Sequence, residues 1–187
     1  MKKLFFIGAT CLICFFTSCK DSTTTSSTTD TNSSAEKAKA NNREVYKAFE
    51  TGDVSKLDSF ISKDGIDHSG GPDGTMEIKG IDNIKKEAMD MKQAFTNIHF
   101  DVIADAVNGD YLFALVKFTA TTTSNPAPGM PANQKIDMTS VDVLKMKDGM
   151  FSEHWSFSDP KDMKKMMGSM GAGGNMNDKM GHTDSTK

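Results

Sequence analysis

The sequence predicts an α+β fold in which N-terminal helices pack over the concave face of a curved antiparallel sheet. Two observations support this prediction. Helical periodicity is confined to residues 35–95, and from residue 98 onward strand-like runs alternate with tight-turn signals. Helices that precede an antiparallel sheet are typical of α+β domains, in which the helices cover one face of the sheet.

Three helices are expected in the first half of the domain. Residues 35–50 and 81–95 place apolar side chains at helical spacing, and residues 54–61 form a shorter segment of the same kind. Gly52 supplies a stop for the first helix. Residues 65–68 are expected to be briefly extended ahead of the glycine-rich loop SGGPDG.

Strands are expected to fill the second half. The sequence pairs Asn108-Gly109 and Asp148-Gly149 are signals for tight hairpin turns. The expected strands are residues 98–107, 111–123, 134–147 and 150–158.

The first 18 residues are predicted to be a secretory signal peptide. Lys2 and Lys3 precede an apolar run that is too short to span a bilayer as a helix. The run ends in FTSC, which resembles a bacterial lipobox, so we expect Cys19 to be lipidated and to anchor the protein in the membrane. The alternative is a plain signal peptide with a stray cysteine. Lys20 after the cysteine resembles the sorting pattern for the outer rather than the inner membrane of the cell envelope.

The remaining chain divides into a tether, one domain and a tail. Residues 19–34 are rich in serine and threonine and are expected to be a flexible tether. Residues 35–168 have a normal size for one domain, and residues 169–187 form a tail rich in methionine and glycine that is expected to be disordered. Thioether-rich tails can bind Cu(I), and the alternative is a helix end with core-facing methionines.

Charge and cysteine content limit the partners. The chain has 22 basic and 25 acidic residues, and removal of the signal peptide takes away only basic ones. An acidic balance disfavours a nucleic acid as partner. After cleavage Cys19 is the one remaining cysteine, so the fold must rest on its apolar core rather than on an internal disulfide.

The last hairpin suggests a pair of acids in an apolar wall. A regular register around the turn at Asp148 would put Asp142 and Glu153 on one face at diagonal positions, with Cβ atoms about 7 Å apart. Two acids in an apolar concavity repel each other, so one should have a raised pKa and serve as an acid/base group. The alternative is that one acid is satisfied by a partner and only shapes the cavity. The apolar side chains expected on this face are Leu144, Met146, Phe151, Trp155 and Phe157.

Two histidines are placed by the same argument. His154 alternates with Glu153 and is expected on the opposite face, at the sheet surface or a dimer interface. His68 stands ahead of the glycine-rich loop, where it is expected either to carry function at the rim of the sheet or to cap a turn. Histidines with zinc-site spacing, phosphate-binding glycine motifs and nucleophile elbows are lacking in the sequence, so neither metal nor cofactor is expected.

The runs GIDNIKKEAMDMKQAF, GMPANQKI and VDVLKMKDGMFSEHWSFSD resemble the SnoaL-like polyketide cyclase family. The resemblance covers residues 41–168. It implies the nuclear-transport-factor-2-like fold, a cone of curved sheet closed by helices around an apolar pocket, and a homodimer formed through the sheet. It also implies that Asp142 is a general acid/base for an aldol closure that needs no cofactor. Trp155 and Glu153 would then line the pocket and His68 would lie at its mouth. Thr123 stands about where the family often has a histidine.

We therefore expect a lipid-anchored domain whose apolar pocket binds a small hydrophobic molecule. Two versions remain open, a non-catalytic binder and a cyclase-like or isomerase-like enzyme that uses Asp142. The alternative from a different class is an envelope protein that assembles through its sheet surface and takes no ligand.

Overall fold

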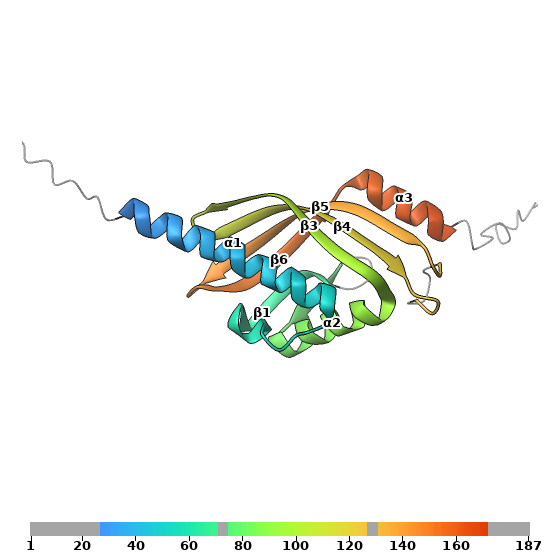
Figure 1. The fold of residues 1–187 in the computed structure, drawn as a ribbon, viewed down its shortest axis with the longest axis horizontal. Helices are drawn as coiled ribbons and strands as arrows, with labels where there is room; N and C mark the ends of the chain where they lie inside the picture. The colour runs from blue at the N-terminus through green and yellow to red at the C-terminus, as the bar shows by residue number, and fades with distance from the viewer. Residues whose placement is uncertain (1–26, 71–74, 127–130, 172–187) are drawn as a thin grey trace, which may run out of the picture.

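The computed structural model describes residues 27–70, 75–126 and 131–171 (Figure 1). The predicted signal peptide, Cys19 and most of the methionine-rich tail lie outside these residues. The elements in chain order are α1 (Ser27–Thr51), a 3₁₀ turn η1 (Leu57–Ser59), β1 (Ile61–Gly70), β2 (Met76–Lys79), α2 (Ile81–Ala94), β3 (Phe95–Asn108), β4 (Tyr111–Thr122), β5 (Lys135–Lys147), β6 (Met150–Ser158) and α3 (Pro160–Gly171).

The six strands form one sheet in the order β2-β1-β6-β5-β4-β3. Consecutive strands from β3 to β6 pair antiparallel, as expected, whereas β1 pairs parallel with β6. The sheet is therefore mixed rather than purely antiparallel. A parallel neighbour requires a long crossover, and the chain from α2 through β5 provides it.

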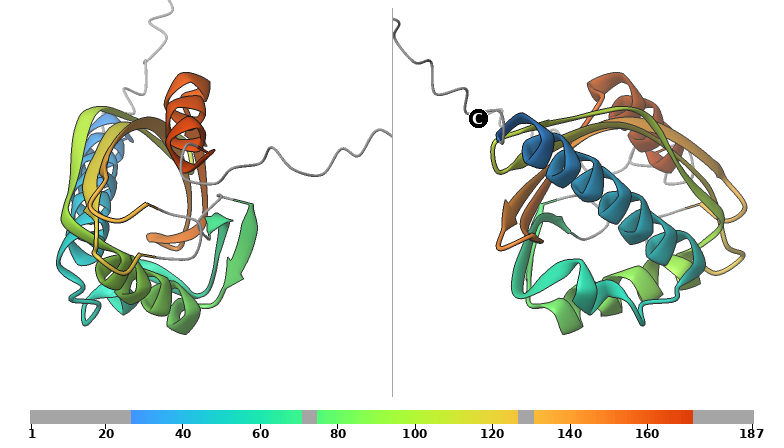
Figure 2. Two further views of the ribbon diagram at one scale, coloured as in Figure 1. Left: turned by 90° about the vertical axis from the view of Figure 1, so that its right-hand side faces the viewer. Right: turned by 60° about the vertical axis from the view of Figure 1, so that its left-hand side comes forward.

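The sheet curves into a cone, with α1 and α2 on its concave side and α3 on the opposite side (Figure 2). This arrangement confirms the predicted α+β fold. The core lies between the concave face and the two helices. Its buried apolar side chains include Val45 and Ala48 from α1, Ile84 from α2, and Leu112, Val116 and Leu144 from the sheet.

Two helices differ from the prediction. Helix α1 begins at Ser27, within the segment expected to be a tether, because each residue added to an existing helix gains a backbone hydrogen bond at little extra cost. The second predicted helix shrinks to the turn η1, and Ile61 instead begins β1, whose ten residues extend well beyond the predicted piece. Helix α2 agrees with its prediction to within one residue. In the described part of the chain, all helices are too short or too polar to cross a membrane.

The last hairpin contains a β-bulge that the sequence did not predict. Asp148 and Gly149 both have positive φ, 54° and 79°, as the predicted tight turn requires. Met146 pairs with Phe151, but the next pair is Lys145 with Glu153, so Ser152 is an extra residue in β6. From this point every partner differs by one residue from the predicted register, which is therefore wrong beyond the bulge.

Candidate functional site

The bulge determines which side chains of β6 face the cavity. Asp142 pairs with Ser156 rather than with Trp155, and Leu144 pairs with His154. His154 therefore lies on the concave face beside Asp142, and the prediction that it points to the far face is wrong. Trp155 and Phe157 lie on the convex face, where Phe157 is 60% exposed, so the prediction that they line the pocket is wrong.

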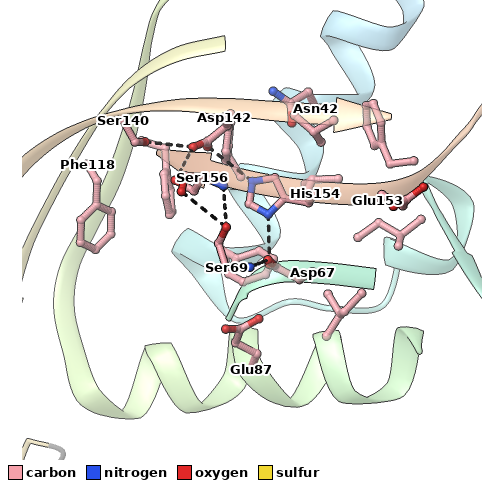
Figure 3. A pocket seen from close by; sticks show the side chains of 18 of the residues that line it. Asn42, Asp67, Ser69, Glu87, Phe118, Ser140, Asp142, Glu153, His154 and Ser156 are labelled. Carbon is pink, nitrogen blue, oxygen red and sulfur yellow. Dashed lines mark hydrogen bonds and ion pairs between the residues drawn. The ribbon is translucent and has the colours of Figure 1, made fainter. Parts of the chain in front are cut away.

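The concave face and the two helices enclose a cavity of about 240 Å³ (Figure 3). Most of its wall is apolar. Of the pocket residues expected from the sequence, Leu144 and Phe151 line it, Met146 packs against the core, and Glu153 borders it with a carboxylate that is bonded elsewhere. Further apolar side chains come from α1, α2 and strands β3 to β5: Phe49, Met91, Phe100, Phe118 and Met138.

Asp142 lies at one end of this cavity and is 5% exposed. Its Oδ1 accepts hydrogen bonds from Ser140 Oγ at 2.9 Å and Ser156 Oγ at 2.7 Å, and its Oδ2 accepts one from Tyr46 Oη at 2.8 Å. Burial alone would raise the pKa of Asp142, but the nearby His154 and these donors hold it below its ordinary value. Lys145 and His68 likewise lower the pKa of Glu153, so the predicted raised carboxyl pKa is wrong for both acids.

His154 is held between two carboxylates. Its Nδ1 lies 3.0 Å from Oδ2 of Asp67, and its Nε2 lies 3.9 Å from Oδ2 of Asp142. Burial lowers the pKa of His154, but its contacts with Asp142 and Asp67 and the charges of both acids outweigh the burial and raise the pKa to about 10. His154 is therefore an imidazolium at neutral pH, with Nδ1–H donating to Asp67. The charged triad Asp67–His154–Asp142 carries one net negative charge.

The remaining contacts hold this triad in place. The backbone N–H of Ser69 donates to Oδ1 of Asp67 at 2.7 Å, and Ser69 Oγ accepts a 2.6 Å bond from the backbone N–H of Ser156. Burial, followed by the charge of Asp142, raises the pKa of Tyr46 far above its usual range. Tyr46 is thus a permanent donor to Asp142. Asn42, one helical turn earlier on α1, hydrogen-bonds to Tyr46.

His68 lies on the convex face rather than in the cavity. Its Nδ1 is 3.0 Å from Oε1 of Glu77 and its Nε2 is 3.1 Å from Oε2 of Glu153. Its ring stacks on Trp155 with centroids 4.6 Å apart and planes 9° from parallel. Strand alternation therefore places the neighbouring Asp67, not His68, at the cavity.

Asp67, Tyr46 and Asn42 were missed by sequence reasoning. Asp67 precedes His68 in an expected extended segment, so alternation was a usable signal. Tyr46 and Asn42 share the buried face of α1, but nothing in the sequence shows that this face meets Asp142. Thr123, where a family histidine was expected, does not line the cavity.

This arrangement can bind and polarise an oxygen atom. Nε2–H of His154 is too far from Asp142 for a good hydrogen bond, so it is available to a ligand. Asp142 already accepts three hydrogen bonds, which makes it a weak base. Within residues 27–70, 75–126 and 131–171, His, Cys, Asp and Glu form no group of three that could hold a metal ion.

The domain is a nuclear-transport-factor-2-like α+β domain. Its curved sheet and covering helices enclose a mainly apolar cavity that contains the triad Asp67–His154–Asp142. Within that class, the chain belongs to the SnoaL-like polyketide cyclase family, whose model matches residues 40–165. The family expected from the sequence is thus confirmed. No curated protein matches the chain significantly.

Solved structures show the same fold. TsrD from Streptomyces laurentii is 19% identical with a TM-score of 0.56, and the match covers 70% of this chain and 96% of that one. A SnoaL-like polyketide cyclase from Agrobacterium tumefaciens is 12% identical with a TM-score of 0.56, covering 70% and 97%. An LEH-like epoxide hydrolase from M. tuberculosis is 13% identical with a TM-score of 0.57, covering 74% and 95%. At these identities the likeness concerns the fold alone.

Proposed function

We propose that the cavity binds a small, mainly apolar molecule that places one oxygen-bearing group against His154. One observation carries the proposal: His154 lines a cavity whose wall is mainly apolar, and its Nε2 lies 3.9 Å from Oδ2 of Asp142, beyond hydrogen-bond distance. A pocket with apolar walls and a few convergent polar groups is the usual form of a small-molecule site. The volume of about 240 Å³ is slightly below the range of about 300–1,000 Å³ for such pockets, which indicates a small ligand.

A cavity-filling substitution tests this proposal. Met138 lines the cavity, so Met138→Trp should remove binding of an apolar probe such as indane, measured by titration calorimetry on the full chain. Met89→Trp is the matched control, because Met89 is 43% exposed on α2. Equal binding of indane by the parent and both variants would contradict the proposal, as would no binding by the parent.

Acid/base chemistry is a second candidate for the same cavity. His154 would stabilise negative charge that develops on a carbonyl oxygen, and Asp142 would exchange a proton with the substrate. The polyketide cyclase named among the similar structures supports this class of reaction. The lowered pKa of Asp142 favours binding over catalysis, since an acid that ionises so readily is a poor base at neutral pH. Asp142→Asn should abolish turnover of any substrate found, and unchanged turnover would rule out Asp142 as the acid/base group.

We also propose that Cys19 carries a lipid that anchors the domain to the cell envelope. The support is the sequence MKKLFFIGATCLICFFTSC and the polar segment that follows it. Cys19→Ser should release the protein from the membrane fraction and abolish incorporation of an alkynyl fatty acid. Cys14→Ser, inside the predicted signal peptide, is the control that should leave both unchanged. Membrane retention by Cys19→Ser would contradict the anchor.

We also propose that two copies of the chain assemble through the convex face of the sheet, which carries an exposed apolar row. Leu115, Val141 and Phe157 are neighbours across β4, β5 and β6 on the convex face, and they are 36%, 40% and 60% exposed. An exposed apolar row of this kind suits a second copy of the chain. Phe157→Glu should shift a dimer to monomer in sedimentation velocity, whereas Met76→Glu on β2 should not. A monomeric parent would contradict the proposal.

A further inference from the structure

The cavity contains a buried acceptor without a partner. Asn42 is 2% exposed, it lines the cavity, and its Oδ1 has no hydrogen bond in the part of the chain that the structure describes. A buried carbonyl oxygen without a donor costs stability. A group retained at such a cost in a ligand cavity is a candidate for ligand contact.

The neighbouring bonds determine which way the amide of Asn42 points. Tyr46 donates its own hydrogen to Oδ2 of Asp142, so it can only accept from Asn42. The hydrogen bond from Asn42 accordingly acts to lower the pKa of Tyr46, as a donor does. The Nδ2 group therefore faces Tyr46, and Oδ1 is the atom left without a partner.

This acceptor and the Nε2–H of His154 are connected through Tyr46 and Asp142, and both residues line the cavity. Tyr46 Oη and His154 Nε2 both approach Oδ2 of Asp142, at 2.8 Å and 3.9 Å, and Asn42 is one hydrogen bond beyond Tyr46. In Figure 3 the side chains of Asn42 and His154 both lie to the right of Asp142, Asn42 above and His154 below. A ligand group that meets both needs must accept one hydrogen bond and donate another.

We infer that the ligand is a neutral alcohol, a hydroxyl group on a compact apolar body. Its oxygen accepts from Nε2–H of His154, and its hydrogen is donated to Oδ1 of Asn42. A ketone satisfies His154 and leaves Asn42 unpaired. A carboxylate places negative charge beside Asn42 Oδ1 and beside a triad that is already net negative. This inference rests on the proposed function, because it specifies the ligand class of the same cavity.

A matched probe series tests the inference: 1-indanol, 1-indanone, indane and indane-1-carboxylate, titrated calorimetrically into the full chain. The alcohol should bind at least about tenfold more tightly than the ketone, because an unpaired buried polar group costs about that factor or more. Indane should bind more weakly than the ketone, and the carboxylate should be the weakest. Equal affinity for alcohol and ketone would overturn the inference, while binding of indane would still uphold the proposed function. Failure of all four probes would overturn both.

Two variants test whether Asn42 causes the preference for 1-indanol over 1-indanone. Asn42→Leu should bring the affinities for 1-indanol and 1-indanone to within about twofold of each other, because one hydrogen bond to a neutral acceptor is lost. Asn41→Leu, at the neighbouring position of α1 and away from the cavity, should keep the parent's preference. If Asn42→Leu fails to fold, the parent supplies the second measurement, the ¹⁵N shift of His154 Nε2, which should move with the alcohol and the ketone but not with indane. A preference that survives Asn42→Leu, or a His154 signal that ignores the alcohol, would overturn the inference.

Discussion

Each face of the sheet carries a histidine between two carboxylates, and the environments of the two clusters differ. On the concave face, His154 lies between Asp67 and Asp142, whose side chains are 14% and 7% exposed. On the convex face, His68 lies between Glu77 and Glu153, whose side chains are 48% and 26% exposed. The two clusters share strands β1 and β6. Asp67 and His68 are consecutive in β1, and Glu153 and His154 are consecutive in β6, so one residue of each couple faces each side of the sheet.

The difference shows that two clusters with the same charge pattern behave differently when water reaches their carboxylates to different extents. Water solvates the carboxylates of the convex cluster, so each charge there has an alternative to its protein partner. The two carboxylates of the concave cluster have far less contact with water, so their charges depend more on His154 and on their hydrogen-bond donors. The same alternation of side chains thus yields a surface ion-pair network on one face and a polar ligand site on the other.

Removal of one carboxylate from each cluster should give the largest contrast. Asp142→Asn should lower the free energy of unfolding by about 3 kcal/mol, because it removes a buried carboxylate and leaves the imidazolium of His154 with a single anionic partner. Glu153→Gln should cost no more than about 1 kcal/mol, as for other exposed ion pairs. Urea unfolding at pH 7 measures both values. Equal losses would contradict the distinction between the faces.

The pH dependence of stability should separate the clusters next. The pKa of His154 rises from 6.5 to about 10 on folding, so its contribution is complete below pH 6.5 and is lost as the pH rises toward 10. The loss is on the order of a few kcal/mol over that range. His154→Gln should remove this decline in unfolding free energy, and His68→Gln should leave it. A parent whose stability is flat between pH 7 and 9 would refute the assignment.

The carboxylate of Asp142 should give the opposite pH dependence to His154, because its contribution to stability is lost as the pH falls. Its pKa in the folded protein lies below the ordinary 3.8, so its contribution is present above that pH and is lost as the pH falls through the folded value. Tyr46→Phe removes one donor to this carboxylate and should cost about 1–2 kcal/mol at pH 7. The loss should shrink as the pH falls through the folded pKa of Asp142, where the carboxylate becomes protonated. Thermal unfolding in a pH series from 7 down to the acid unfolding of the parent tests this, and a loss that stays constant through the series would count against it.

The smallest effect is expected from Glu77 on the convex face. Glu77→Gln breaks the contacts of this carboxylate to His68 and Lys79, but water can replace both partners. The urea midpoint should stay within experimental error of the parent. A shift comparable to that of Tyr46→Phe would mean that the convex cluster also depends on its internal pairing.

The sequence predicts much of the fold because its signals there are local. Helix α2 and the turn at Asp148-Gly149 follow from apolar spacing and turn chemistry, and both are confirmed. The burial of Asp142 in an apolar wall also follows from strand alternation. The parallel pairing of β1 with β6 does not, because it joins segments almost ninety residues apart and leaves no local pattern.

The site was predicted only in part because one residue reverses the face of its neighbours. Ser152 carries no turn or glycine signal, yet as the extra residue of the bulge it turns His154 into the cavity and Trp155 out of it. The positions of Asn42 and Tyr46 depend on the docking of α1 over the concave face of the sheet, which is a tertiary contact. The sequence therefore identified the main acid of the site and not the groups that set its charge.

The protonation state of His154 is the most direct test, because Nδ1–H is committed to Asp67 and Nε2 then carries a hydrogen for a ligand only if the ring is an imidazolium. Long-range ¹H–¹⁵N spectra of the parent at pH 8, assigned with His154→Gln and His68→Gln, report both ring nitrogens. We expect both nitrogens of His154 to carry protons at this pH. A neutral tautomer that titrates near pH 6.5 would contradict this expectation.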